Sequence, residues 1–273
     1  MSLKKIFSLF LLSLFSLFSI FPIYSILSAS WRSQDSFHST TFVLWGADSS
    51  WKNYFDLFLK TDFLVWVQNS VVVSTSVTIL GVGLATFAGY ALSRFHMKGK
   101  KSALLFLMMT QMFPCTMLLL PFYIVLTKLK LMNSFLGLIL VYSATALPFC
   151  IWQMKGFFDT IPKELEEAAR MDGCSNWKVF NLVILPISLP ALVITSLFSF
   201  LTAWCEYAIA AIVLQDPALY TLPIGLKTFQ SSLSTQWGLY SAGAVVVSIP
   251  VVALFMYLTR YLISGLTLGS VKG

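Results

Sequence analysis

Charged side chains are scarce in this sequence. Asp, Glu, Lys and Arg make up 11% of its 273 residues, whereas soluble domains carry roughly 25%. Hydrophobic residues make up 58%, and the mean hydropathy is +0.82. So little polar surface excludes a soluble enzyme, a disordered chain and a nucleic-acid-binding module. The composition predicts an all-α, polytopic membrane protein, because helices satisfy their own backbone hydrogen bonds in lipid.

Residue types that build catalytic and metal sites are also few. The four cysteines form no CxxC pair and the histidines are only His38 and His96, so neither a zinc site nor a disulfide framework is indicated. An ATP-binding P-loop needs Gly-x4-Gly-Lys-Ser/Thr, and the nearest string, 99–102, does not match. We therefore expect no metal, no catalytic residue and no cofactor in this chain.

Six apolar runs are each long enough for a transmembrane helix, which needs about 20 residues. They cover approximately residues 6–27, 64–92, 103–126, 134–154, 187–213 and 241–263. The first run follows Lys4 and Lys5 and is longer than the apolar core of a signal peptide, so we expect a retained span. We divide the chain into three parts. Residues 1–62 contain this first span and a Trp-rich interfacial segment, 63–263 form the transmembrane core, and 264–273 are a tail.

Basic residues indicate the orientation. With six spans both termini lie on one side of the membrane, and twelve of the 18 Lys and Arg residues fall on that side. Cytoplasmic loops are enriched in Lys and Arg. We therefore predict a multi-pass protein of the cell (inner or cytoplasmic) membrane with both termini in the cytoplasm. The net charge of +7 then reflects orientation rather than nucleic-acid binding.

Helix-breaking and polar residues inside the predicted spans mark a candidate pathway. Each proline removes a backbone donor, so we expect Pro114 and Pro121 to kink the third span, and broken helices are a device of transport proteins. Glu206 is an acidic residue within a span, where a charge costs about 2.5–3.5 kcal/mol. It is either a functional group or a hydrogen-bonded group that joins two helices. The candidates for pathway or gating are Gln111, Pro114, Pro121, Pro148 and Glu206.

The loop 155–186 contains the clearest local signals. Pro162 predicts a helix that has this residue in its first turn, with the acids Glu164, Glu166 and Glu167 near the positive end of the helix dipole. Gly173 ends this helix. A second helix is predicted from about residue 175, so the loop projects from the membrane as two short helices.

The spacing of this loop resembles a known motif. Glu167-Ala168-Ala169, followed by Gly173, Val183 and Leu185-Pro186, is similar to the EAA loop of binding-protein-dependent ABC importer permeases, which usually have isoleucine at the position of Val183. The strings at 110–114, 144–149, 221–226 and 264–273 resemble the carbohydrate branch, of the maltose and maltodextrin type. Cys205 departs from the asparagine that this branch often has.

The resemblance implies a six-span type I ABC importer permease that forms half of the translocation pathway for a sugar, maltose, maltodextrin or a related oligosaccharide. Its implied partners are a second permease subunit, an ATPase dimer that binds ATP and Mg, and an extracytoplasmic solute-binding protein. Residues 163–173 would be the coupling helix in a cleft of the ATPase. The implied coupling residues are Glu167, Ala168, Ala169, Asp172 and Gly173. In this family Glu167 would pair with a basic group of the ATPase, the two alanines would permit close contact, and Gly173 would make the turn.

The resemblance also assigns the outer loop 215–240 to the binding protein and the C-terminal tail to the ATPase pair. The candidates for contact with the binding protein are Gly225, Leu226, Phe229 and Trp237. Three alternatives remain open. The first is an ion-coupled carrier that uses Glu206, although this function would leave the helix at 163–173 unexplained. The second is a membrane scaffold or enzyme subunit. The third is an ABC permease for a solute such as glycerol phosphate.

The predicted orientation is testable with a reporter enzyme fused after Gly273. Because the positive-inside rule places this end in the cytoplasm, the fusion should be active only with a cytoplasmic reporter. Activity of a periplasmic reporter at this position would contradict the topology.

Overall fold

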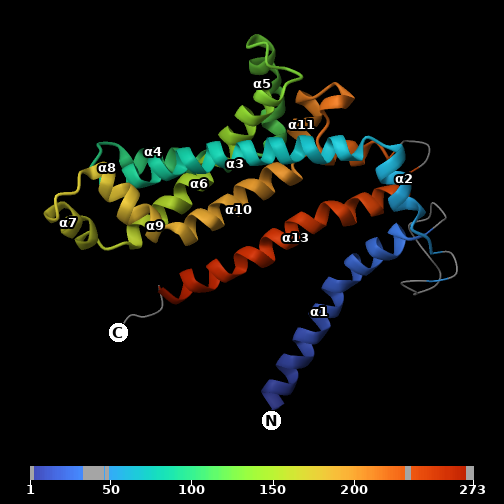
Figure 1. Ribbon diagram of the computed structural model, residues 1–273, viewed down its shortest axis with the longest axis horizontal. Helices are drawn as coiled ribbons and strands as arrows, with labels where there is room; N and C mark the ends of the chain where they lie inside the picture. Colours follow the sequence, from blue (N-terminus) through green and yellow to red (C-terminus); the bar gives the residue numbers. More distant parts are fainter. Residues whose placement is uncertain (1–2, 33–45, 47–48, 231–234, 269–273) are drawn as a thin grey trace. The chain divides into compact units, whose positions relative to one another are not determined.

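The computed structural model describes residues 3–32, 46, 49–230 and 235–268, and within these ranges the side chains from 5 to 258. All named elements in these ranges are helices (Figure 1). Four are long and apolar enough to cross a membrane, or up to six if each of two bent helix pairs is one span. The all-α membrane fold is therefore confirmed, with a span count of four to six. Two compact units are formed by 1–67 with 222–250 and by 68–221 with 251–273.

The first unit contains α1 (Leu3–Ser30), α2 (Lys52–Lys60), α12 (Leu222–Lys227) and the first parts of α3 (Phe63–Arg94) and α13 (Trp237–Leu268). The end of α1 is tied to α2 by hydrogen bonds. Asn53 Nδ2 donates to the carbonyl oxygen of Ser30 at 3.0 Å, and the Tyr54 hydroxyl lies 2.8 Å from Ser30 Oγ. Burial raises the pKa of Tyr54, so its hydroxyl stays protonated. The predicted interfacial segment thus includes a helix fixed to the first span.

The second unit contains the other helices. They are α4 (Lys100–Thr110), α5 (Cys115–Lys128), α6 (Phe135–Thr160), α7 (Glu164–Met171), α8 (Asn176–Val179), the π-helix η1 (Phe180–Ile184), α9 (Leu185–Ile187), α10 (Leu189–Cys205), α11 (Ala208–Val213) and the 3-10 turn η2 (Pro217–Leu219). Helix α6 packs against α4, α10 and α11, and α11 also packs against α5. Within this unit α7 and α8 lie at one end of the long helices (Figure 1).

A buried cluster joins α3, α6 and the segment from α8 to α10. Ala85, Met154 and Ile184 are each fully buried in it. Gly89 of α3 lies so close to α6 that a Cβ atom there would sit 2.9 Å from the backbone nitrogen of Lys155. Small residues permit this approach of two membrane helices. The packing brings the end of α3 beside the end of α6, where the site described below begins.

The predicted third span is broken rather than kinked. Helices α4 and α5 meet at an angle of 98°, and Pro114 is the N-cap of α5 in an extended conformation, with ψ of 128°. A proline disfavours helix in the residue before it and cannot donate to the preceding turn, so it begins a new helix here. Pro121 lies inside α5 and Pro148 inside α6, as expected for prolines within spans.

The predicted fifth span, 187–213, is also interrupted. The helical segment 176–187 meets α10 at 74°, and α10 ends at Cys205, because Glu206 is extended. A short separate helix, α11, follows. Glu206, which the sequence places within this span, thus occupies a helix break, where its side chain can reach free backbone donors.

The close approach of α3 and α6 predicts a difference between two glycines of the same helix. Gly89→Ala should destabilise the protein by about 1–3 kcal/mol, because the new methyl group meets the α6 backbone. Gly83→Ala is the matched control, since a Cβ atom there meets nothing within 4 Å. Thermal unfolding of the purified complex in detergent measures both. Equal unfolding temperatures of the two variants would contradict the packing.

Candidate functional site

The predicted two-helix projection is present as α7 and α8 (Figure 1). Helix α7 begins after its N-cap residue Lys163, so Pro162 lies before the helix and not in its first turn as predicted. A proline immediately before the helix still restricts the backbone conformation of the residues that lead into it. Helix α8 starts where predicted: Ser175 is its N-cap and accepts a hydrogen bond from the backbone nitrogen of Lys178 at 3.4 Å.

Gly173 makes the turn between the two helices, as predicted. Its φ is +84°, in the left-handed region that favours glycine. The backbone nitrogen of Cys174 donates to the Ala169 carbonyl and that of Gly173 to the Arg170 carbonyl, each at 3.0 Å. This pair of hydrogen bonds is the Schellman ending of a helix. Because a Cβ atom at Gly173 meets nothing within 4 Å, any strain from a substitution is conformational rather than steric.

The predicted coupling residues divide between the two faces of α7. Glu167, Ala168, Asp172 and Gly173 are exposed, whereas Ala169 is 8% exposed and belongs to the buried cluster of the second unit. Large apolar side chains are exposed near them: Leu165 at 43%, Met171 at 88% and Trp177 at 64%. An exposed patch that combines apolar and charged groups is typical of a surface for a partner protein.

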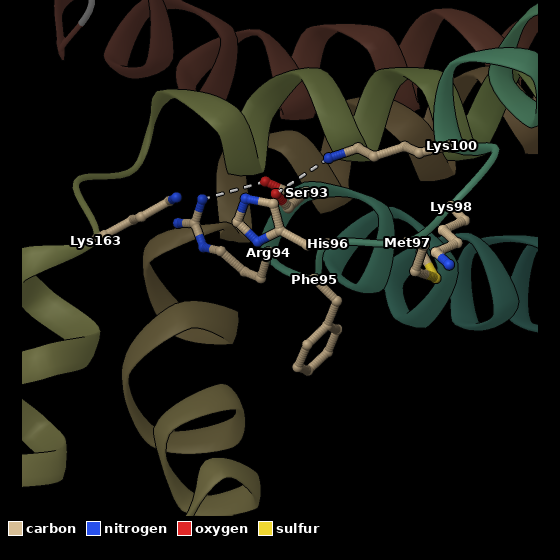
Figure 2. A pocket seen from close by; sticks show the side chains of 8 residues that line it. All are labelled: Ser93, Arg94, Phe95, His96, Met97, Lys98, Lys100 and Lys163. Carbon is tan, nitrogen blue, oxygen red and sulfur yellow. Dashed lines mark hydrogen bonds between the residues drawn. The ribbon is translucent and has the colours of Figure 1, made fainter.

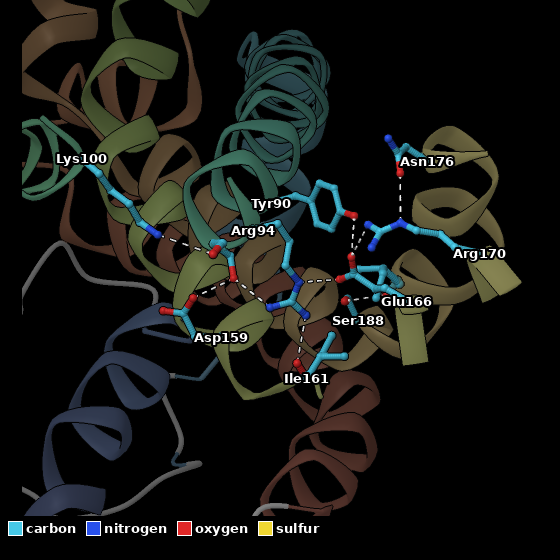
Figure 3. Close-up of polar contacts among 11 residues, drawn as sticks. Tyr90, Arg94, Lys100, Asp159, Ile161, Glu166, Arg170, Asn176 and Ser188 are labelled. Atoms are coloured by element: carbon cyan, nitrogen blue, oxygen red, sulfur yellow. Dashed lines mark hydrogen bonds and ion pairs between the residues drawn. The ribbon is translucent and has the colours of Figure 1, made fainter. Parts of the chain in front are cut away.

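The opposite face of α7 carries a buried ion pair that the sequence analysis did not identify (Figure 3). The side chains of Glu166 and Arg94 are 3% and 7% exposed, and Glu166 Oε1 accepts from Arg94 Nε. Glu166 Oε2 accepts from the Tyr90 hydroxyl at 3.1 Å and from Arg170 at 3.3 Å. Arg94 also donates to the Ile161 carbonyl at 2.9 Å. Glu166 therefore fixes α7 to the end of α3.

The sequence holds one signal that points to this burial. Glu166 lies three residues before Ala169, so both fall on the face of α7 that meets the core. Aromatic rings pack beside the pair: the Tyr90 ring, whose hydroxyl binds Glu166, lies 5.7 Å from that of Phe158 and 4.8 Å from that of Phe180. Because both side chains are almost completely removed from solvent, the loss of either partner is costly.

Further polar contacts continue from the ion pair to α6. Arg94 donates to Ser93 Oγ at 3.1 Å, and Ser93 Oγ donates to Asp159 Oδ1 at 2.7 Å. Asp159 also forms an ion pair with Lys155, one turn earlier in α6. Helices α3, α6 and α7 are therefore connected by one continuous set of hydrogen bonds and ion pairs (Figure 3).

Glu206 is a hydrogen-bonded group at the junction of three helices. Its carboxylate accepts from the Tyr142 hydroxyl of α6 at 2.7 Å. It also accepts from the backbone nitrogens of Ile209 at 3.0 Å and Ala210 at 3.2 Å, at the start of α11. Of the two interpretations of this residue, the geometry supports a structural tie between helices.

The other pathway candidates lie along α4, α5 and α6. Gln111, at the break after α4, donates to the Thr145 carbonyl of α6 at 3.1 Å. Pro148 is buried, whereas Pro114 and Pro121 are exposed. A cavity of about 130 Å³ lies between α6 and α10 and is lined by Gln111, Thr145, Ala146, Phe149, Cys150, Phe198, Ser199 and Thr202. The structure thus brings Gln111 to the surface of α6.

Three of the four candidates for contact with the binding protein are buried in the first unit. Gly225 has no room for a Cβ atom against the Trp66 ring, Leu226 is 9% exposed, and the Phe229 ring lies 5.7 Å from that of Trp66. Trp237 is half-buried at the start of α13. The predicted tail, 264–273, continues α13 to Leu268, and residues 269–273 lie outside the described part.

Comparison with known proteins identifies the class to which this arrangement belongs. A helical membrane core with an EAA-type projection is the arrangement of an ABC importer permease. The chain belongs to the family of binding-protein-dependent transport system inner membrane components, whose profile matches residues 79–267. The predicted family is therefore confirmed.

Several of its relatives are sugar-import permeases by name. The chain is 35% identical to the maltodextrin transport system permease protein MdxG of Bacillus subtilis, over 80% of this chain and 78% of the relative. It is 36% identical to the diacetylchitobiose uptake system permease protein DasC of Streptomyces coelicolor, over 77% and 76% of the two chains. Identity with the maltose/maltodextrin permease protein MalG of Vibrio vulnificus is 38%, over 77% and 73%.

Solved structures support the fold. A chain from a bacterial ABC transporter involved in the import of alginate matches with a TM-score of 0.81 at 23% identity, over 94% of this chain and 96% of that one. A chain from a bacterial alginate transporter in complex with its periplasmic protein matches with a TM-score of 0.68 at 13% identity, over 94% of each chain. At this identity the matches show the ABC importer permease fold.

The buried ion pair predicts a large effect on stability. Glu166→Ala should lower the free energy of unfolding by about 3–5 kcal/mol, because it leaves the buried Arg94 guanidinium without its carboxylate. Glu164→Ala removes an exposed acid of the same helix and should change it by less than about 0.5 kcal/mol. Thermal or denaturant unfolding of the purified complex measures both.

A double variant tests the cause of this loss. Arg94→Met with Glu166→Leu removes both charges, and buried pairs replaced by apolar groups are often neutral. The double variant should therefore be more stable than Glu166→Ala alone. If Glu166→Ala were no less stable than Glu164→Ala, the ion pair would not anchor α7.

Proposed function

We propose that this chain is the permease subunit of an ATP-driven sugar importer and forms half of its translocation pathway. The observation that carries the proposal is α7, which exposes Glu167 and Ala168 on one face and is anchored through Glu166 on the other. The relatives named for maltodextrin, maltose and diacetylchitobiose support a saccharide as the solute. Within this class we favour a maltose- or maltodextrin-like oligosaccharide over glycerol phosphate.

The exposed face of α7 would receive the force from a separate ATPase dimer, which binds ATP and magnesium. Glu167 would pair with a basic group of the ATPase, and Ala168, the exposed member of the alanine pair, would permit close approach. Asp172 and Gly173 follow on the same exposed side. Met171, at 88% exposure, and Trp177, at 64%, supply apolar surface that a partner would cover.

The buried face of α7 would transmit that force to the transmembrane helices. Glu166 binds Arg94 at the end of α3, and Arg94 also binds the carbonyl of Ile161, directly after α6. A rotation of α7 that broke this pair would cost about 3–5 kcal/mol. Movement of α7 together with α3 and α6 is therefore easier than movement of α7 alone, as alternation between inward- and outward-facing states requires.

The remaining partners would be a second permease subunit, a solute-binding protein outside the membrane and the surrounding lipid. We place both termini and α7 in the cytoplasm on the basis of the distribution of Lys and Arg. Because Gly225, Leu226 and Phe229 are buried, exposed neighbours such as Lys227 and Thr228 would meet the binding protein first.

The solute route would follow α6. Gln111, Thr145 and Thr202 line a cavity beside it and offer hydrogen-bonding groups suited to sugar hydroxyls. The helix breaks at Pro114 and Glu206 would allow the ends of the spans to move. Since the Glu206 carboxylate accepts hydrogen bonds from three donors, the Tyr142 hydroxyl and two backbone nitrogens of α11, we assign it to holding these helices rather than to ion coupling.

The test uses the complete importer reconstituted in vesicles, with sugar uptake and ATP hydrolysis measured together. Glu167→Gln should reduce both by roughly tenfold or more, because an interfacial charge pair is lost at the centre of a docking surface. The exposed Glu167 side chain makes no contact that the fold needs, so the amount of protein in the membrane should stay unchanged.

Glu164→Gln is the matched control, because this exposed acid lies on the same helix but outside the EAA motif. It should retain most of the uptake and ATP hydrolysis. Full sugar uptake by Glu167→Gln, or purification of the native complex without an ATPase subunit, would contradict the proposal.

A further inference from the structure

A cationic pocket lies beside the anchored end of α7 (Figure 2). Its volume is about 430 Å³, and it forms where α3 ends, the turn 95–99 follows and α4 begins. Lys163, the N-cap of α7, lies on its other side. The lining residues are Ser93, Arg94, Phe95, His96, Met97, Lys98, Lys100 and Lys163. The proposed transport function gives no role to this pocket.

The basic groups of the pocket converge. Figure 2 shows the ends of Lys163, Arg94, His96 and Lys100 around the space next to Ser93, whereas Lys98 points away from it. No Asp or Glu lines the pocket. Its surroundings therefore favour an anion, and the convergent nitrogens are suited to a group with several acceptor oxygens.

The neighbouring acids do not neutralise all of this charge. Glu166 is paired with Arg94 and Arg170, and Asp159 is paired with Lys155 and interacts electrostatically with Lys100. Among the described residues, Lys163 has no acid within ion-pair distance, and it is exposed. At least one cation of the pocket thus remains available to a ligand.

The position of the pocket indicates which anion reaches it. It lies at the ends of two apolar helices, and the turn between them exposes the large apolar side chains of Phe95, at 53%, and Met97, at 44%. Apolar groups beside Lys and Arg at the end of a span are typical of the headgroup level of a bilayer. A ligand with a phosphate above acyl chains matches both features.

We propose that this pocket binds the phosphate of an anionic phospholipid headgroup. The phosphate would lie among Lys163, His96 and Lys100, close to the Ser93 hydroxyl, with the acyl chains along the apolar surface near Phe95. Lys163 is the N-cap of α7, and Arg94 at the end of α3 anchors α7 through Glu166. A lipid in this pocket would therefore contact the junction between α7 and α3.

The test uses the complete importer in nanodiscs of phosphatidylcholine with a small fraction of spin-labelled phosphatidylglycerol. The labelled lipid should be enriched at the protein, and Lys163→Gln should weaken its binding about fivefold, the effect of one basic residue near an anionic lipid. Lys98→Gln is the matched control, since this lysine belongs to the turn that lines the pocket but its side chain extends away from Ser93 (Figure 2). It should change the binding less than twofold.

A second arm distinguishes a lipid phosphate from a free one. Excess inorganic phosphate should leave the labelled lipid bound, because the apolar part of the site holds only the lipid. Displacement by inorganic phosphate with the same dependence on Lys163 would overturn the lipid assignment in favour of a soluble anion. Equal effects of Lys163→Gln and Lys98→Gln would overturn the pocket itself.

A third result would assign the pocket to a protein partner. If labelled lipid binds the permease pair but not the complex with the ATPase, acidic groups of the ATPase occupy the pocket, and the proposal is wrong. The readout in every arm is lipid binding, so a failure here is distinguishable from a failure of the transport function.

Discussion

The structure depends on one buried ion pair, Glu166 with Arg94, at the junction of α7, α3 and α6. A short helix of eight residues is unstable alone, so α7 needs tertiary contacts to persist. Glu166 supplies them on one face, while the other face stays free for a partner. An unpaired charge there would be costly because both side chains are buried, so we expect the two helices to move together. The same contact thus stabilises α7 and connects it to the membrane.

A second constraint comes from lipid, which offers no partners for free backbone groups. At the helix breaks, side chains supply hydrogen-bond partners. At the end of α10 the Glu206 carboxylate accepts hydrogen bonds from the free backbone nitrogens of Ile209 and Ala210. At the break after α4, Gln111 bonds to the carbonyl of Thr145 on α6. Of these two pathway candidates, Glu206 therefore completes the hydrogen bonding of an interrupted helix, and Gln111 ties a helix break to α6.

Much of this arrangement could be predicted from local sequence. Chain-wide hydropathy specifies the helices, and the spacing from Glu167 to Gly173 specifies a helix with a left-handed ending. The anchor was missed because its partners, Arg94 and Glu166, are 72 residues apart, and the spacing from Glu166 to Ala169 indicates the buried acid only once Ala169 is known to face the core. Pro114 was expected to kink a helix and instead divides it. The burial of Gly225 against Trp66 depends on packing between distant segments and has no local signal.

The central claim is that the ion pair carries movement from α7 to the transmembrane helices. The ratio of sugar imported to ATP hydrolysed, measured in vesicles with the complete importer carrying Glu166→Gln, tests it most directly. Because Glu167 and Ala168 stay exposed for docking, we predict that ATP hydrolysis persists while the ratio falls severalfold. An unchanged ratio in a folded, fully assembled Glu166→Gln complex would contradict the account.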